Sequence, residues 1–193
     1  MKCYILMGSP RKNGNTAALL KPFQKELSAL GVETEVTWLY DRTIEPCIGC
    51  RACQDDWSGF GCIHRDDVQN IADRILESDL LILATPIYSW YCTSPMKALL
   101  DRLVYGMNKF YGREKGPALW AGKKVALLTT CGYHPEKGAD LWEDGMKRYC
   151  KHSELEYLGM LAERDLGSRT VFLDQGKEER ARQFAQALVS RMG

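Results

Sequence analysis

The chain has 193 residues, of which 45% are hydrophobic, enough to fill one buried core. Its 26 basic and 25 acidic residues leave a formal net charge of +1, so no excess of charge favours nucleic acid or an anionic membrane as a partner. No apolar run reaches the roughly 18 residues of a membrane helix, and the N-terminal run is too short for a signal peptide, so we expect a soluble, cytoplasmic protein.

Predicted strands and helices alternate along the chain. In chain order we expect a strand at 3–7, a helix at 15–30, a strand at 32–39, a helix at 66–77, a strand at 80–84, a helix at 95–105, a strand at 123–130, a helix at 136–152, a strand at 154–161 and a helix at 175–191. Short apolar runs closed by turn residues indicate buried strands, whereas the alternation over 32–39 favours a strand near a sheet edge. The pattern predicts an α/β fold: a doubly wound, five-stranded parallel sheet with helices on both faces. We assign residues 1–193 to one domain.

Unusual loops follow most of the predicted strands. The carboxyl ends of parallel strands lie along one sheet edge, where ligands of this architecture bind. The loops at that edge are 8–16, 40–66, 85–94 and 130–134. The insertion at about 40–66 is rich in cysteine and lacks periodicity, and a loop of that length is usually functional.

The first of these loops, 8–16, joins a strand to a helix. Its hydroxyl groups, small residues and free helix-start amides suit a phosphate group. It matches neither the Walker pattern nor Gly-x-Gly-x-x-Gly, which disfavours nucleoside triphosphates and dinucleotides. An ordinary capped turn would explain the loop equally well.

Aromatic residues gather after the strand at 80–84. At a strand tip the rings of Tyr88, Trp90 and Tyr91 would be left in water unless they pack against a flat surface. A flavin ring provides such a surface. The alternative is that these rings fill a dimer interface.

Three separated motifs occur in order at the strand ends. They are Gly-Ser-Pro-Arg at 8–11 with Asn-Thr at 15–16, Thr-Pro-Ile-Tyr at 85–88, and Pro-Met-Lys at 95–97 with Leu-Asp-Arg at 100–102. On these motifs the chain resembles the NADPH-dependent FMN reductase and iron-sulfur flavoprotein branch of the flavodoxin-like superfamily. The resemblance runs from residue 1 to about 132, and it implies the flavodoxin-like strand order 2-1-3-4-5 with bound FMN.

The resemblance also implies which residues contact FMN. Ser9, Arg11, Asn15 and Thr16 would hold the phosphate; Pro86, Ile87, Tyr88, Ser89 and Trp90 would line the isoalloxazine ring; and Thr130, Cys131 and Gly132 would support its other edge. Hydride would pass from NADPH or NADH to the flavin, and electrons would leave to a quinone, free flavin, metal centre or protein acceptor. Because the flavin supplies this chemistry, we assign no catalytic residue.

Two other classes of function stay open. One is a non-enzymatic electron carrier, in which FMN, with or without a cluster, shuttles electrons between protein partners. The other is a flavin-free binding module of the response-regulator type, which shares the topology. The second class needs an acidic phosphoacceptor after the first strand, where this sequence has Ser9 and Arg11.

Four of the eight cysteines, Cys47, Cys50, Cys53 and Cys62, lie within sixteen positions. Four thiolates so spaced can wrap a [4Fe-4S] cluster, and the resemblance implies one here, although the last gap is longer than the related motif has. Zinc is the second interpretation. The third is a loop without metal, its thiols reduced or joined in a disulfide.

The resemblance further implies a homodimer or homotetramer. In such an assembly, rings of Trp57, Phe60, Trp90 and Tyr91 would flank the flavin edge. Cys131 and His134 lack a third orienting group, so we do not interpret them as a nucleophile and its base. His64 is expected at the surface.

Overall fold

The computed structural model describes residues 1–167 and 171–192. Its strands are β1 (Lys2–Met7), β2 (Glu33–Trp38), β3 (Leu80–Pro86), β4 (Lys124–Cys131) and β5 (Glu156–Arg164). Its helices are α1 (Asn15–Ala29), α2 (Val68–Glu77), α3 (Ser94–Met107), α4 (Pro135–Gly138), α5 (Asp140–His152) and α6 (Gln175–Ser190), with short 3₁₀ turns η1 (Leu39–Asp41) and η2 (Ala52–Gln54).

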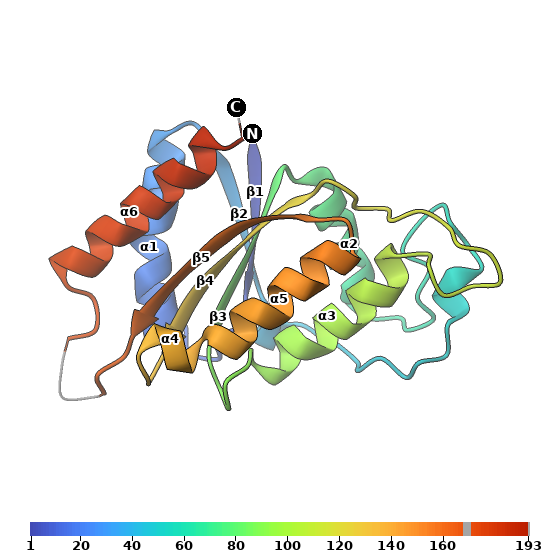
Figure 1. The fold of residues 1–193 in the computed structure, drawn as a ribbon, viewed down its shortest axis with the longest axis horizontal. Helices are drawn as coiled ribbons and strands as arrows, with labels where there is room; N and C mark the ends of the chain where they lie inside the picture. Colours follow the sequence, from blue (N-terminus) through green and yellow to red (C-terminus); the bar gives the residue numbers. More distant parts are fainter. Residues whose placement is uncertain (168–170, 193) are drawn as a thin grey trace.

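The five strands form one parallel sheet in the order β2-β1-β3-β4-β5. Helices α1 and α6 cover one face, and α2, α3 and α5 cover the other (Figure 1). The predicted fold class, strand order and two-sided helical cover are therefore confirmed. The assignment of the whole chain to one domain stays a prediction.

Burial along the strands follows their place in the sheet. All seven residues of the central strand β3 are buried, because helices shield both of its faces. The edge strand β2 alternates exposed and half-buried positions from Glu33 to Val36, as its sequence predicts, but Thr37 is buried with its hydroxyl 2.7 Å from that of Tyr4. One apolar cluster lies under α2, α3 and α5, and the other under α1 and α6.

Several element boundaries differ from the prediction, most of them by one or two residues. The helix expected over 136–152 is broken at Ala139, which separates α4 from α5. Strand β3 continues through Pro86, whose missing N–H is tolerated at the last position of the strand. Strand β5 runs three residues past the predicted end at 161.

The cysteine-rich insertion, residues 40–66, leaves the end of β2 and reaches the carboxyl end of α3 (Figure 1). It carries little regular structure beyond η2. No helix among the described residues has both the length and the apolarity needed to cross a membrane.

Candidate functional site

Hydrogen bonds join the loops after β1 and β3 to each other and to the ends of the neighbouring strands β3 and β4, at the carboxyl edge of the sheet. The Gly8 amide donates to the Ala84 carbonyl at 2.7 Å, and the Thr93 hydroxyl donates to the Gly8 carbonyl at 2.8 Å. The Ile87 amide donates to the Thr130 carbonyl at 2.8 Å. A Cβ at Gly8 would lie 2.9 Å from the Thr93 hydroxyl, so only glycine permits this close approach.

The loop after β1 offers hydrogen-bond donors to an anion. The buried Ser9 hydroxyl accepts from the Arg11 amide at 3.2 Å and closes a tight turn. Gly14 precedes α1, and no described side chain caps the start of this helix. The first-turn amides are therefore available to an anion, with the exposed Arg11 beside them. Asn15, half-buried, is the first residue of the helix.

Thr16 has a different environment from the exposed part of this loop. Its hydroxyl lies 2.7 Å from the hydroxyl of Thr130, and the two residues are only 2% and 5% exposed. This buried pair ties the first turn of α1 to the tip of β4. Thr16 therefore orients the loop through its side chain and offers its backbone amide to a ligand.

The segment after β3 forms a strained turn that exposes aromatic rings. Tyr88 and Tyr91 exchange backbone hydrogen bonds of 2.9 and 3.1 Å. The two central residues, Ser89 and Trp90, have φ angles of 50° and 63°, as a type I′ turn requires. Each non-glycine residue in this region costs about 1–3 kcal/mol, and such strain gathers at functional sites. Tyr88 and Trp90 are nearly half exposed.

A pocket lies between this turn and the loop after β4. The Trp90 ring stacks on Tyr133 with centroids 6.0 Å apart and planes 9° apart, and its Nε1 donates to the Lys137 carbonyl at 3.2 Å. The lining residues are Ile87, Ser89, Trp90, Cys131, Gly132, Tyr133 and Gly138. Residues predicted from two separate motifs thus share one pocket, while Pro86 lies buried at the end of β3. Sequence reasoning missed Tyr133 and Gly138, although an aromatic residue after the Cys-Gly pair was a usable signal.

Cys131 has the properties of a structural thiol. Burial raises the pKa of this thiol to about 11, and its Sγ donates to the Tyr133 carbonyl at 3.3 Å. His134 instead lies 2.7 Å from the guanidinium of Arg164. A neutral, buried thiol is a poor nucleophile, which agrees with the prediction that Cys131 and His134 are not a catalytic pair.

The cysteine-rich insertion builds a second, smaller pocket. Cys47, Cys50, Cys53 and Cys62 all line it, together with Arg102 and Tyr105 of α3, and all four are free thiols. Within residues 1–167 and 171–192, no three Cys, His, Asp or Glu side chains are arranged to hold a metal ion. The insertion therefore gathers thiol donors around one cavity without a ready-made coordination shell.

Buried polar contacts anchor the insertion to α3 and the segment after it. The Gln54 amide group donates to the carbonyls of Tyr105 at 2.6 Å and Asn108 at 3.2 Å. The ammonium of Lys109 donates to the carbonyls of Cys53 at 2.7 Å and Phe60 at 3.3 Å. Burial lowers the pKa of Lys109, while the nearby Cys53 and Asp56 oppose that shift.

Two aromatic side chains of the insertion pack away from the strained turn. Phe60 is buried against Gly106, near the end of α3. Trp57 packs over Gly116 and donates its indole N–H to the Gln54 carbonyl at 3.2 Å. Within one chain, Trp57 and Phe60 thus anchor the insertion at the far end of α3, away from Trp90. The expectation that they flank a flavin edge in an assembly of subunits stays a prediction.

Arg102 forms the inner wall of the cysteine pocket. Its guanidinium donates to Cys62 Sγ at 3.3 Å, to the Glu45 carbonyl at 3.2 Å, and forms an ion pair with Asp66 in which both side chains are buried. Burial alone would raise the pKa of Asp66, but hydrogen bonds from Arg102 and backbone amides outweigh it and lower the pKa. Arg102 Nε and His64 Nε2 are buried without a hydrogen-bond partner among the described residues. His64 as a whole is half-buried in the lining of this pocket, and so is less exposed than the surface residue that the sequence predicts.

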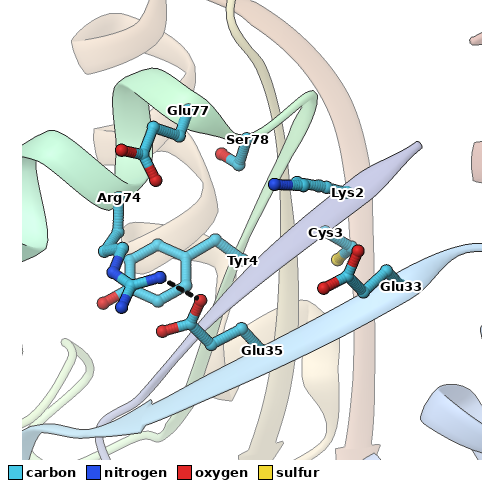
Figure 2. Close-up of a pocket in the computed structure, with 8 residues that line it drawn as sticks. All are labelled: Lys2, Cys3, Tyr4, Glu33, Glu35, Arg74, Glu77 and Ser78. Atoms are coloured by element: carbon cyan, nitrogen blue, oxygen red, sulfur yellow. Dashed lines mark hydrogen bonds and ion pairs between the residues drawn. The ribbon is translucent and has the colours of Figure 1, made fainter.

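A third pocket lies at the opposite edge of the sheet, where the strands begin (Figure 2). Its lining residues are Lys2, Cys3, Tyr4, Glu33, Glu35, Arg74, Glu77 and Ser78. Three glutamates face two basic residues there, and Arg74 is already paired with Glu35 at 3.0 Å. This acidic pocket would repel a phosphate, so it does not compete with the carboxyl edge as an FMN site.

Sequence comparison finds relatives among flavoproteins. The chain is 36% identical to an iron-sulfur flavoprotein of Methanocaldococcus jannaschii over 53% of this chain and 51% of the relative. It is 37% identical to an iron-sulfur flavoprotein of Archaeoglobus fulgidus over 55% of this chain and 47% of the relative. The chain thus spans about half the length of the curated relatives it matches.

A solved NAD(P)H:quinone oxidoreductase from Methanothermobacter marburgensis has a similar fold. The TM-score is 0.70, at 22% identity over 98% of this chain and 97% of the other. Residues 1–140, which contain every strand-tip loop described above, match the family described as NADPH-dependent FMN reductase. The match covers well over half of the sequence, and the chain belongs to the NADPH-dependent FMN reductase family.

Proposed function

We propose that the protein is an FMN-dependent oxidoreductase that takes electrons from NADPH or NADH and passes them to a quinone, free flavin, metal or protein acceptor. One observation carries this proposal: a strained aromatic turn and an uncapped helix start lie at the same sheet edge, joined by buried hydrogen bonds. These features fit a ligand with a flat ring at one end and a phosphate at the other.

The proposed roles follow from the geometry. Ser9 shapes the phosphate loop, Arg11 supplies its positive charge, and the first amides of α1 point their partial charge at the phosphate. Ile87 and Trp90 offer apolar surface to the ring. FMN, when bound, supplies the hydride and electron chemistry, and the protein supplies position and access.

The first test separates the phosphate contact from the ring contact. Arg11→Gln should weaken FMN binding about tenfold, since a charge-assisted hydrogen bond is lost, and leave riboflavin binding unchanged. Lys12→Gln is the matched control, because Lys12 is already engaged with Asp41 and the Trp38 ring. Fluorescence titration of both flavins measures this. Equal losses for FMN and riboflavin would place the phosphate elsewhere.

The second test is turnover. The FMN-loaded protein should oxidise NADPH or NADH with a quinone or ferricyanide as acceptor, followed in a spectrophotometer. Stoichiometric FMN without nicotinamide oxidation, together with docking to a redox partner, would favour the electron-carrier alternative.

We also propose that the four-cysteine pocket holds a thiolate-bound metal group, with a [4Fe-4S] cluster preferred over zinc. The support is a set of free thiols around one cavity, and the printed names of the two relatives above. Anaerobically purified protein should contain about four irons per chain. Zinc at one per chain would support the second interpretation, and metal-free protein the third.

We further propose a cytoplasmic homodimer or homotetramer. The eight free thiols suit a reducing compartment, and Tyr133 and Leu141 expose apolar surface beside the pocket at the strand tips. Gel filtration at micromolar concentration should give a dimer or larger species. A monomer at that concentration would contradict this assembly.

A further inference from the structure

Two buried cations lie beside the cysteine pocket. Arg102 and Lys109 are 2% and 0% exposed. Arg102 is balanced by Asp66, whereas Lys109 forms no ion pair within the described part of the chain and is held only by the carbonyls of Cys53 and Phe60. A buried charge without a counter-charge is costly, so a negative charge placed nearby would stabilise this ammonium.

The cysteines of this pocket can supply such a charge from inside the protein when a bound metal ion holds them as thiolates, whereas burial raises the pKa of the metal-free Cys53 thiol. Asp56 also acts on Lys109 electrostatically, but its carboxylate lies in solvent, where water and salt screen it. Cys53 is buried, and Lys109 contacts its backbone carbonyl. Cys62 receives the guanidinium of Arg102 on its sulfur. One positive charge thus contacts the sulfur of Cys62, and the other contacts the backbone of Cys53.

We propose that Lys109 is a positioning residue that makes this pocket selective for an anionic thiolate-bound metal group and sets its affinity and reduction potential. The inference rests on the metal site proposed above. A divalent ion bound by four thiolates carries a net charge of −2, because four negative ligands surround two positive charges. Net charge and hydrogen bonds to sulfur are among the features that set the potential of a thiolate-bound centre.

The test replaces Lys109 by methionine, which fills similar volume without charge. Lys123→Met is the matched control: Lys123 also clamps two carbonyls, those of Leu76 and Ser78, but at the opposite sheet edge. Anaerobic full-length protein is titrated with Co²⁺, and the thiolate-to-metal absorption reports binding. Loss of one positive charge near a group of net charge −2 should weaken Co²⁺ binding by at least about tenfold, because at an effective dielectric of about 20 the attraction between two unit charges about 4 Å apart already exceeds the free energy of a tenfold change in affinity. The control should bind as the wild type does.

The reconstituted cluster gives a second readout that a structural role would not move. The equilibrium constant for one-electron reduction should fall about tenfold in Lys109→Met, a downward shift of about 59 mV. If Lys109→Met does not fold by circular dichroism, Lys109→Gln keeps donors for the two carbonyls without the charge and should show the same changes.

The outcomes separate the two proposals. Wild-type protein that binds neither Co²⁺ nor iron through its cysteines would overturn the metal site itself. Wild-type protein that binds Co²⁺, with unchanged affinity and potential in both Lys109 variants, would overturn the role of Lys109 and leave the metal site standing.

Discussion

The contact between Phe60 and Gly106 predicts that Gly106→Ala destabilises the wild-type protein but stabilises a variant that lacks the Phe60 ring. An alanine Cβ at Gly106 would lie 2.2 and 2.4 Å from two ring carbons of Phe60, which is fully buried. The ring belongs to the cysteine-rich insertion, and the glycine to the last turn of α3. Gly106→Ala should therefore displace the Phe60 ring from its buried position against α3.

The expected magnitudes follow from opposing terms. Overpacking costs about 1–3 kcal/mol, whereas replacing a helical glycine by alanine gains about 0.5–1 kcal/mol. Gly106→Ala should thus destabilise the wild type by about 1–2 kcal/mol. In a Phe60→Ala background, itself destabilised by about 3–5 kcal/mol, only the helix gain is left. The same substitution should then stabilise the protein by about 0.5–1 kcal/mol.

Urea unfolding at 25 °C of the two single variants, the double variant and the wild type measures the coupling, expected at about 2 kcal/mol or more. Phe60→Leu is a milder background for the same cycle. Gly176→Ala in α6, where a Cβ would meet only the ends of flexible side chains, should show the helix gain alone. Additive effects of Gly106→Ala and Phe60→Ala would refute the packing described here.

Three further results are expected. Thr130→Val should lower the free energy of unfolding in urea by about 1–3 kcal/mol, because it leaves the Thr16 hydroxyl buried and unpaired. The double variant Thr16→Val with Thr130→Val should lose less stability than Thr130→Val alone, and a larger loss would contradict this pairing. Ser89→Gly should raise the melting temperature in calorimetry, since glycine relieves a φ of 50° worth about 1 kcal/mol, and an unchanged or lower value would argue against strain. Asp66→Asn should cost about 3–5 kcal/mol at pH 7. Because the pKa of Asp66 is lowered in the folded protein, the ion pair stabilises the fold above the ordinary pKa of 3.8, and this stabilisation is lost as the pH falls through the pKa of the folded state. The difference in unfolding free energy between Asp66→Asn and the wild type should therefore shrink in acid. A difference that does not depend on pH would exclude the ion pair.

The sheet could be predicted from sequence because its signals are local. The runs at 3–7, 80–84 and 123–130 are apolar throughout and closed by turn residues, so each identifies a buried strand without tertiary information. The break at Ala139 directly follows Gly138, the last residue of α4, so a local signal was present there and the prediction of one continuous helix missed it.

That some of the candidate-site residues lie together could also be predicted from sequence, while their roles toward a ligand stay predictions. Phosphate-loop and aromatic-turn residues follow strands, and parallel topology brings strand ends together. The positive φ angles of Ser89 and Trp90 were not visible, because Ser-Trp is not a usual sequence for a type I′ turn. Lys109 was missed because its proposed role depends on a contact with Cys53, which is 56 positions away along the chain.

Helix α3 connects the loop after β1 with the cysteine-rich insertion. It starts one residue after Thr93, which bonds to the phosphate loop, and Arg102 of its later turns faces the cysteines. With a rise of about 1.5 Å per residue, Thr93 and Arg102 are held about 14 Å apart along its axis. A one-residue insertion within α3 would turn every later side chain by about 100° and aim Arg102 away from Cys62. The same insertion in the exposed 112–115 stretch would leave that alignment intact. The distance and orientation between the two regions are therefore set by helix α3 and not by the loops.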